Sequence, residues 1–273
     1  MTSLARRLPL GTTRPTAADR VRQSGVIVAT VVALAGALYG SGAAGGRPSP
    51  QGAAGGRAIP QVAGGAFGPD ATLVAAAGPA FAIWSVIYAG LAGYAVWQAL
   101  PSQAARRRQR AVGYWLVGSL LLNATWILCV QAGLLALSVA VIVLLLAVLA
   151  LAFSRLRNDP GETTADAVLF DGTVGLYLGG GIGATVANIA AWLRTAGFAG
   201  FGVSPSLWAV ALLIVVAVIG CALAFWDRGR LTPAFSAAWG LVWIAVARAE
   251  GDLQEDVVAA TALAAGILIV LVT

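Results

Sequence analysis

Long apolar runs separated by short polar segments dominate the pattern of hydrophobic positions along this 273-residue chain. Most runs are about 20 residues long, the length that a helix needs to cross a hydrocarbon core of about 30 Å. The pattern predicts eight spans, at residues 24–44, 79–100, 112–131, 134–154, 168–192, 206–226, 233–248 and 257–273. We therefore expect an all-α, polytopic transmembrane bundle of about eight helices.

The two runs nearest the C-terminus are the shortest, since residues 233–248 and 257–273 span only 16 and 17 positions. A helix of that length is marginal for crossing a bilayer. Two arrangements follow from the pattern. Either both runs cross the membrane, or they form a re-entrant hairpin that leaves six full spans.

Composition favours a membrane chain over a soluble one. Hydrophobic residues make up 59% of the chain, charged residues make up 10%, and the mean hydropathy is +0.86, whereas soluble domains carry roughly 25% charged residues. All 17 positive charges are arginine. Arginine clusters beside apolar runs, as at residues 106–110, are typical of topology signals. No nucleic-acid partner is expected.

The arginines are divided unequally between the two predicted sides. With a cytoplasmic N-terminus, the inside segments hold 13 of the 17, and the outside segments hold Arg47, Arg57, Arg194 and Arg248. This asymmetry satisfies the positive-inside rule and predicts that both termini are cytoplasmic. The expected location is a bacterial plasma membrane. A cleaved secretory signal is the alternative for the first run, but its length and the seven runs after it favour a retained helix.

Few side chains in the spans could support catalysis or metal binding. The chain has no histidine, and Cys129 and Cys221 stand alone in apolar runs. Acid/base and metal sites therefore lack their usual groups, so we expect no enzyme and no required cofactor. Asp171 is interpreted as the cap of the fifth span. Arg248, in the turn between the last two spans, is placed in the headgroup region, and a deeper position would mark it as functional.

Small residues recur at helical spacing in two spans, at Gly36 and Gly40, and at Gly175, Gly179, Gly183 and Ala187. Such faces allow close contact between helix backbones. The pattern predicts helix packing, and it makes a homodimer through these glycine faces plausible.

Nine tryptophans are many for this length. Five lie near span ends, as in an aromatic belt: Trp97, Trp115, Trp192, Trp208 and Trp226. The other four lie deeper inside their spans: Trp84, Trp126, Trp239 and Trp243. The deeper group is therefore a candidate for ligand binding rather than for anchoring.

Three motifs resemble the tryptophan-rich sensory protein (TspO, or peripheral benzodiazepine receptor) family. Residues 84–88, Trp-Ser-Val-Ile-Tyr, resemble its W-T-x-L-Y signature, and residues 122–126, Leu-Asn-Ala-Thr-Trp, match its L-N-x-x-W. Residues 176–188 resemble P-Y-L-x-W-x-x-x-A-x-x-L-N, in which Leu176, Gly180 and Ala187 replace the proline, the tryptophan and the second leucine. The chain is thus similar to a divergent TspO protein.

This resemblance divides the chain into three predicted parts. Residues 1–23 form a basic cytoplasmic tail, residues 24–192 a TspO-like five-helix bundle, and residues 193–273 an extension of about three helices. Within the bundle, residues 45–78 are rich in Gly, Ala and Pro and are predicted to form a mobile external loop. The loop lies on the side where it could cover a pocket.

Helix arithmetic places the motif residues in one layer. Tyr88, Asn123 and Ala184 each lie about 12 to 13 Å below the outer ends of their spans, with Trp84 and Trp126 one turn above. The candidate ligand-binding residues are Trp84, Tyr88, Asn123, Trp126, Tyr177, Ala184 and Asn188. Ring faces with two amides suit a flat apolar ligand, although buried amides also join helices.

The resemblance implies binding of a tetrapyrrole such as protoporphyrin or haem, or of a sterol-like ligand, in a sensory or transport role. Because haem iron would lack a histidine ligand, recognition should rest on stacking and shape. Membrane lipid and a flat apolar small molecule are the expected partners. The alternatives are a small-solute transporter, or permease, and a membrane scaffold protein; a transporter should carry ionisable groups inside the membrane.

Overall fold

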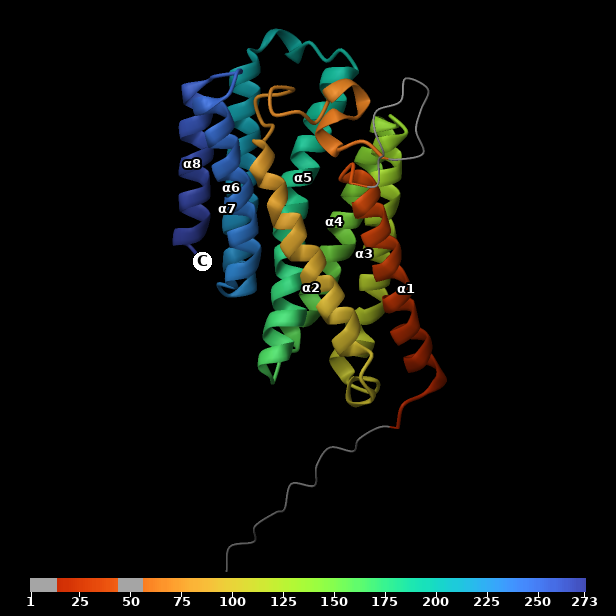
Figure 1. Cartoon of the computed structure of the whole chain (residues 1–273). Helices are drawn as coiled ribbons and strands as arrows, with labels where there is room; N and C mark the ends of the chain where they lie inside the picture. Colours follow the sequence, from red (N-terminus) through yellow and green to blue (C-terminus); the bar gives the residue numbers. More distant parts are fainter. Residues whose placement is uncertain (1–13, 44–55) are drawn as a thin grey trace, which may run out of the picture.

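The computed structural model describes residues 14–43 and 56–273, and the regular structure of these residues is entirely helical (Figure 1). Its α-helices are α1 Ala17–Gly40, α2 Ala82–Gln98, α3 Arg107–Gln131, α4 Leu135–Asn158, α5 Thr173–Thr195, α6 Pro205–Asp227, α7 Leu231–Glu250 and α8 Asp256–Leu271. Seven of them, with α2 counted together with the 3-10 turn Gly78–Phe81 before it, are long and apolar enough to cross a membrane, and α8 is shorter. The predicted polytopic helical bundle is confirmed.

The helices form two groups that meet at α5. In the first group, α1 packs on α2 and α3, α3 on α4, α4 on α5 and α5 on α2, which closes a five-helix ring. In the second group, α8 packs against α6 and α7, and α7 packs against α5 (Figure 1). A buried apolar core fills the ring around Leu116, Leu149 and Tyr177, and a separate core fills the second group around Leu213 and Leu241.

Helix α1 begins at Ala17, so residues 17–23 are helical rather than part of a polar tail. The side chain of Thr16 accepts a hydrogen bond from the backbone N–H of Asp19, and Asp19 bonds back to the Thr16 backbone, which forms a capping box. Asp19 and Arg22 are buried against α3, where Arg110 pairs with Asp19 at 2.6 Å. Residues 1–13 of the predicted tail lie outside the described residues.

Helix α7 has 20 residues, four more than its apolar run, because Leu231 and Thr232 at one end and Ala249 and Glu250 at the other continue the helix. Helix α8 starts after the α7–α8 turn, and Thr273 beyond its end contacts Gly229 in the turn between α6 and α7. Helix α8 therefore runs alongside α7 from one end to the other. This geometry favours two crossing helices over a re-entrant hairpin.

The described part of the predicted loop is folded onto the bundle. We call residues 56–77 the cap; they contain two short 3-10 turns, Ile59–Gln61 and Ala63–Gly65, and a third turn, Gly78–Phe81, leads into α2. Val62, Ala66 and Phe67 of the cap pack in a small core with Val130 and Ala191 at the ends of α3 and α5. Residues 44–55 lie outside the described residues.

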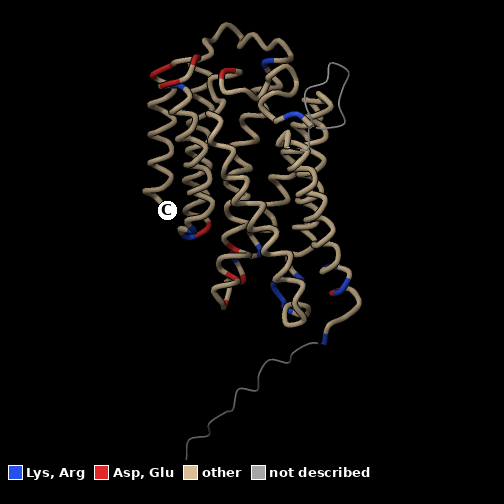
Figure 2. Tube along the Cα trace, viewed as in Figure 1, with Lys and Arg blue, Asp and Glu red and all other residues tan. Residues whose placement is uncertain are grey.

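The cap lies at one end of the bundle, which we call the cap end, and most arginines lie at the other, which we call the arginine end (Figure 2). Among the described residues, only Arg57, Arg194 and Arg248 are arginines of the cap end. The asymmetry behind the predicted orientation is therefore present in three dimensions. That the arginine end is cytoplasmic stays a prediction.

Candidate ligand-binding site

A cavity of about 120 Å³ lies between α2, α5 and α7 and is covered by the cap. Its wall is almost entirely apolar. The cap contributes Phe67, Thr72, Val74 and Ala75, α6 contributes Leu213 and Val216, and α7 contributes Ser236, Trp239, Gly240 and Ile244. The cavity therefore joins the five-helix ring to the second group of helices.

Glycine makes the floor of the cavity. Gly179, Gly180 and Gly183 of α5 line it together with Gly240 of α7. A Cβ added at Gly183 or at Gly240 would meet nothing within 4 Å, so the missing side chains leave open space. The cavity exists partly because these positions carry no side chain.

The glycine face of α5 also packs against α7, as its spacing predicts. A Cβ at Gly175 would collide with Thr232, and one at Gly179 would collide with the backbone of Pro233. On α1, Gly36 and Gly40 lie in the same way against Ala124 and Ile127 of α3. Gly36, Gly40, Gly175 and Gly179 are thus covered within the chain, whereas Gly183 borders the cavity. The homodimer through the glycine faces stays a prediction.

Aromatic rings form the cavity walls. Trp84 of α2 and Trp126 of α3 lie on the ring side, and Trp239 lies on the α7 side. Trp84 packs edge-on against Tyr177 with centroids 6.0 Å apart, and Phe67 packs edge-on against Trp126 at 6.4 Å. These rings present large apolar surfaces to anything that enters.

Three of the seven sequence-predicted site residues line the cavity: Trp84, Trp126 and Ala184. Tyr88, Asn123 and Tyr177 lie behind the wall instead. The Tyr88 hydroxyl donates to Asn123 Oδ1 at 2.6 Å, and the Tyr177 hydroxyl donates to the Ser119 carbonyl at 3.3 Å. The layer predicted from helix arithmetic thus brings Tyr88 and Asn123 together, but they join helices and do not contact the cavity.

Asn188 also lies behind the wall, where it is fully buried. Its Oδ1 accepts a hydrogen bond from Trp126 Nε1 at 2.9 Å, and its Nδ2 donates to the Ser138 hydroxyl at 3.0 Å. Asn188 therefore links α3, α4 and α5 and fixes the ring plane of Trp126. It acts on the cavity through that ring.

The motifs did not predict that α6 and α7 line the cavity, and the covering role of the loop before α2 was expected from its position alone. Trp239 was singled out as deep within its span, but no motif connected it with α2. Its Nε1 donates to the Ala80 carbonyl at 3.0 Å, and the Ala77 backbone N–H donates to the Trp243 carbonyl at 3.1 Å. Arg248 Nη2 donates to the Pro69 carbonyl. Helix α7 thus holds the cap and the start of α2 at three points.

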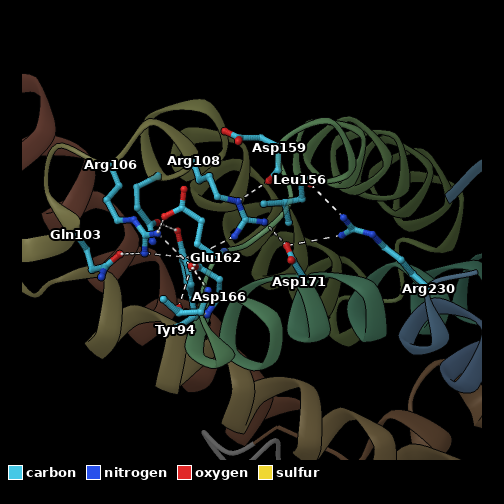
Figure 3. Close-up of polar contacts among 12 residues, drawn as sticks. Tyr94, Gln103, Arg106, Arg108, Leu156, Asp159, Glu162, Asp166, Asp171 and Arg230 are labelled. Carbon is cyan, nitrogen blue, oxygen red and sulfur yellow. Dashed lines mark hydrogen bonds and ion pairs between the residues drawn. The ribbon is translucent and has the colours of Figure 1, made fainter. Parts of the chain in front are cut away.

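A cluster of charged residues closes the arginine end (Figure 3). Asp166 pairs with Arg106 and Arg108 at 3.1 Å each, and Arg108 also pairs with Asp171. Arg230, at the start of α7, lies 3.7 Å from Asp171. These contacts tie α3, α5 and α7 together, so arginines predicted only as topology signals also have structural partners.

Both aspartates lie on a π-helix, Asp166–Gly172, that leads directly into α5. The sequence suggested that Asp171 caps the first turn of this helix. It does not, because the helical structure begins before Asp171, at Asp166 or earlier. Asp166 accepts hydrogen bonds from the backbone N–H of Glu162 and Thr163, and its side chain is 1% exposed. The extra residue of a π-turn changes the direction of side chains along a helix, and both carboxylates here meet Arg108.

Comparison with protein-family models matches residues 57–273 to the family described as TSPO-like protein. The match contains α2 to α8, and hence every helix that lines the cavity, and it begins after α1. No curated protein and no solved structure matches the chain.

Proposed function

Because the chain belongs to the TSPO-like protein family, we propose that this integral, multi-pass membrane protein binds a flat apolar ligand of the tetrapyrrole class in the capped cavity. The family predicted from the three motifs is confirmed. The observation that carries the proposal is the cavity itself, with its tryptophan walls, glycine floor and almost wholly apolar lining.

The chemistry of the lining suits stacking. Ring faces of Trp84, Trp126 and Trp239 can lie against a planar molecule. Neither the chain as a whole nor the cavity lining offers histidine, and no Cys, Met or Tyr is among the lining residues in the described chain. Recognition would therefore use the shape of the macrocycle and not its metal.

The cavity must widen before it can hold a tetrapyrrole. At about 120 Å³ it is smaller than the roughly 300 to 1,000 Å³ of typical small-molecule pockets. A tetrapyrrole would have to widen it, and the cap is the part of the wall that is not a membrane-spanning helix. Ligand entry is therefore proposed to displace the cap from α5 and α7.

Titration of the purified protein with protoporphyrin IX, followed by tryptophan quenching, tests the proposal. Gly183→Leu and Gly240→Leu fill open space in the cavity, so each should weaken binding at least about tenfold. Gly118→Leu is the matched control, because an added Cβ on that face of α3 approaches only Val148, at 3.9 Å. Equal affinity in all three variants would exclude this cavity.

The same titration separates the proposed binding role from its rivals. Absence of quenching with wild-type protein would remove the tetrapyrrole and leave the transporter and scaffold alternatives. Zinc protoporphyrin should bind about as tightly as the metal-free compound, since the lining offers no usual metal ligand. A strong preference for the metal form would contradict recognition by shape.

A further inference from the structure

Arg248, near the end of α7, is fully buried at the cap end of the protein, with 0% of its side chain exposed. Its Nη2 donates to the Pro69 carbonyl of the cap. The nearest carboxylate is Asp70, at 3.7 Å from Nη2, and the Asp70 side chain is 41% exposed. This pair is long, is not joined by a hydrogen bond, and leaves Asp70 largely in contact with solvent.

Two of the three guanidinium nitrogens lack a partner. Arg248 Nε and Nη1 are buried and have no hydrogen-bond acceptor among the described residues. Burying a charged donor without an acceptor is costly, so buried arginines are normally paired. Arg248 is therefore buried inside the protein, in the last turn of α7, while its expected position at headgroup depth stays a prediction.

Helix α7 carries two further unpaired polar groups, the Ser236 hydroxyl and Trp243 Nε1. Ser236 and Ile244 line the cavity, and Arg248 follows Ile244 by one helical turn, about 6 Å. Cap residues 72–76 contribute to the cavity, while Pro69 and Asp70, just before them, contact Arg248. Arg248 itself is not among the lining residues; it lies one turn beyond the cavity wall, where α7 meets the cap.

We propose that Arg248 binds a carboxylate carried by the ligand whose apolar body occupies the cavity. A single guanidinium charge matches one carboxylate, and its unpaired N–H groups supply charge-assisted donors. A dianionic phosphate fits less well, because Asp70 is close and the α7–α8 turn carries Glu250, Asp252 and Glu255. The ligand class is therefore an amphipathic, carboxylate-bearing flat molecule.

This inference rests on the proposed function, and one pair of ligands separates the two. Protoporphyrin IX carries two carboxylates, and its dimethyl ester has the same macrocycle with both masked. Affinities for the two compounds are to be measured with wild-type protein, Arg248→Gln, Arg248→Lys and Asp70→Asn. Arg194→Gln is the matched control, since it removes an exposed arginine at the same end of the protein.

Arg248→Gln should weaken binding of the acid at least about 30-fold, as expected for loss of one partner of a buried charge pair. Binding of the ester should be unchanged, which also shows that the variant is folded. Arg248→Lys should retain part of the preference for the acid. Asp70→Asn should strengthen binding of the acid only, because it removes a competing carboxylate, and Arg194→Gln should alter neither affinity.

Two results would overturn the inference. If wild-type protein binds acid and ester equally, or if Arg248→Gln weakens both equally, then Arg248 only holds the cap, while the cavity proposal survives. If neither compound binds wild-type protein, the proposed function fails and this inference fails with it.

Discussion

Glu162 and Asp166 illustrate how burial decides what one carboxylate contributes. Both pair with Arg106, but the side chain of Glu162 is 83% exposed and that of Asp166 is 1% exposed. Asp166 also pairs with Arg108, whose side chain is 5% exposed. Removal of Asp166 leaves a buried guanidinium short of a partner, whereas removal of Glu162 exposes nothing new.

The expected result is a large difference in stability between two conservative variants. Asp166→Asn should lower the free energy of unfolding by about 3 to 5 kcal/mol, and Glu162→Gln should lower it by no more than about 1 kcal/mol. Unfolding midpoints in detergent, read by tryptophan fluorescence, provide the measurement. Similar losses in both variants would show that Asp166 is not a structural centre of the arginine end.

At the residue scale, the sequence predicted how deep a residue lies along its helix, but not the direction in which its side chain points. Helix arithmetic correctly placed Tyr88 beside Asn123, yet it could not show that the amide faces a tyrosine hydroxyl and not the cavity. Rotation of a helix about its own axis depends on packing with partners distant in sequence. Gly180 and Ala187, two departures from the family motif, both line the cavity, so those departures enlarge it.

At the element scale, the cap depends on a contact with the end of α3. Gln131 Nε2 donates to the Arg57 carbonyl at 2.6 Å, and the Arg57 backbone N–H donates to Gln131 Oε1 at 3.2 Å. One glutamine thus holds both backbone groups of Arg57. Between α1 and α2 the only arginines are Arg47 and Arg57, and Arg47 precedes a proline, so trypsin has one susceptible bond there.

Gln131→Leu should therefore make the bond after Arg57 more sensitive to trypsin. Two lost hydrogen bonds favour local opening, and the cleavage rate should rise at least about fivefold. Gln23→Leu is the matched control, because Gln23 makes a comparable contact with the Gln98 carbonyl at the arginine end. The fragments are resolved by mass spectrometry, and an unchanged rate in Gln131→Leu would show that this contact does not hold the cap.

Helix ends were the elements that the sequence predicted least well. The apolar runs were correct in number and order, but α1 and α3 extend beyond them through charged residues. A span predicted from hydropathy ends at the first polar position. The helix itself continues where ion pairs, such as Asp19 with Arg110, neutralise the charges. The cap was predicted as a bare loop because its few bulky residues, such as Phe67, are far apart in sequence.

At the scale of the whole molecule, α5 joins the two helix groups. Its residues Val174, Tyr177 and Leu178 belong to the core of the ring, and Ile182 belongs to the core of the second group. Contact with α7 depends on Gly175 and Gly179, where there is no room for a side chain. The sequence predicted a packing face there, but not which helix would cover it.

Two alanine substitutions on α5 test this junction. Gly179→Ala should destabilise the protein by about 1 to 3 kcal/mol, because the obstacle is the backbone of Pro233, which cannot rotate away. Gly181→Ala, two residues further along, meets only the side chains of Leu146 and Leu149 at 3.5 and 3.7 Å and should be neutral or slightly stabilising. Equal unfolding midpoints would mean that α5 and α7 are not tightly docked.

The three contacts between α7 and the segment that covers the cavity also affect how fast a ligand binds and leaves. A ligand passing beneath that segment must wait for the contacts at Ala80, Ala77 and Pro69 to open together. Where these contacts form again over the bound ligand, the barrier slows arrival and departure by the same factor and leaves the equilibrium constant unchanged. A brief rise in ligand concentration would then end before much ligand had bound, and an occupied protein would keep its ligand after the free ligand concentration had fallen.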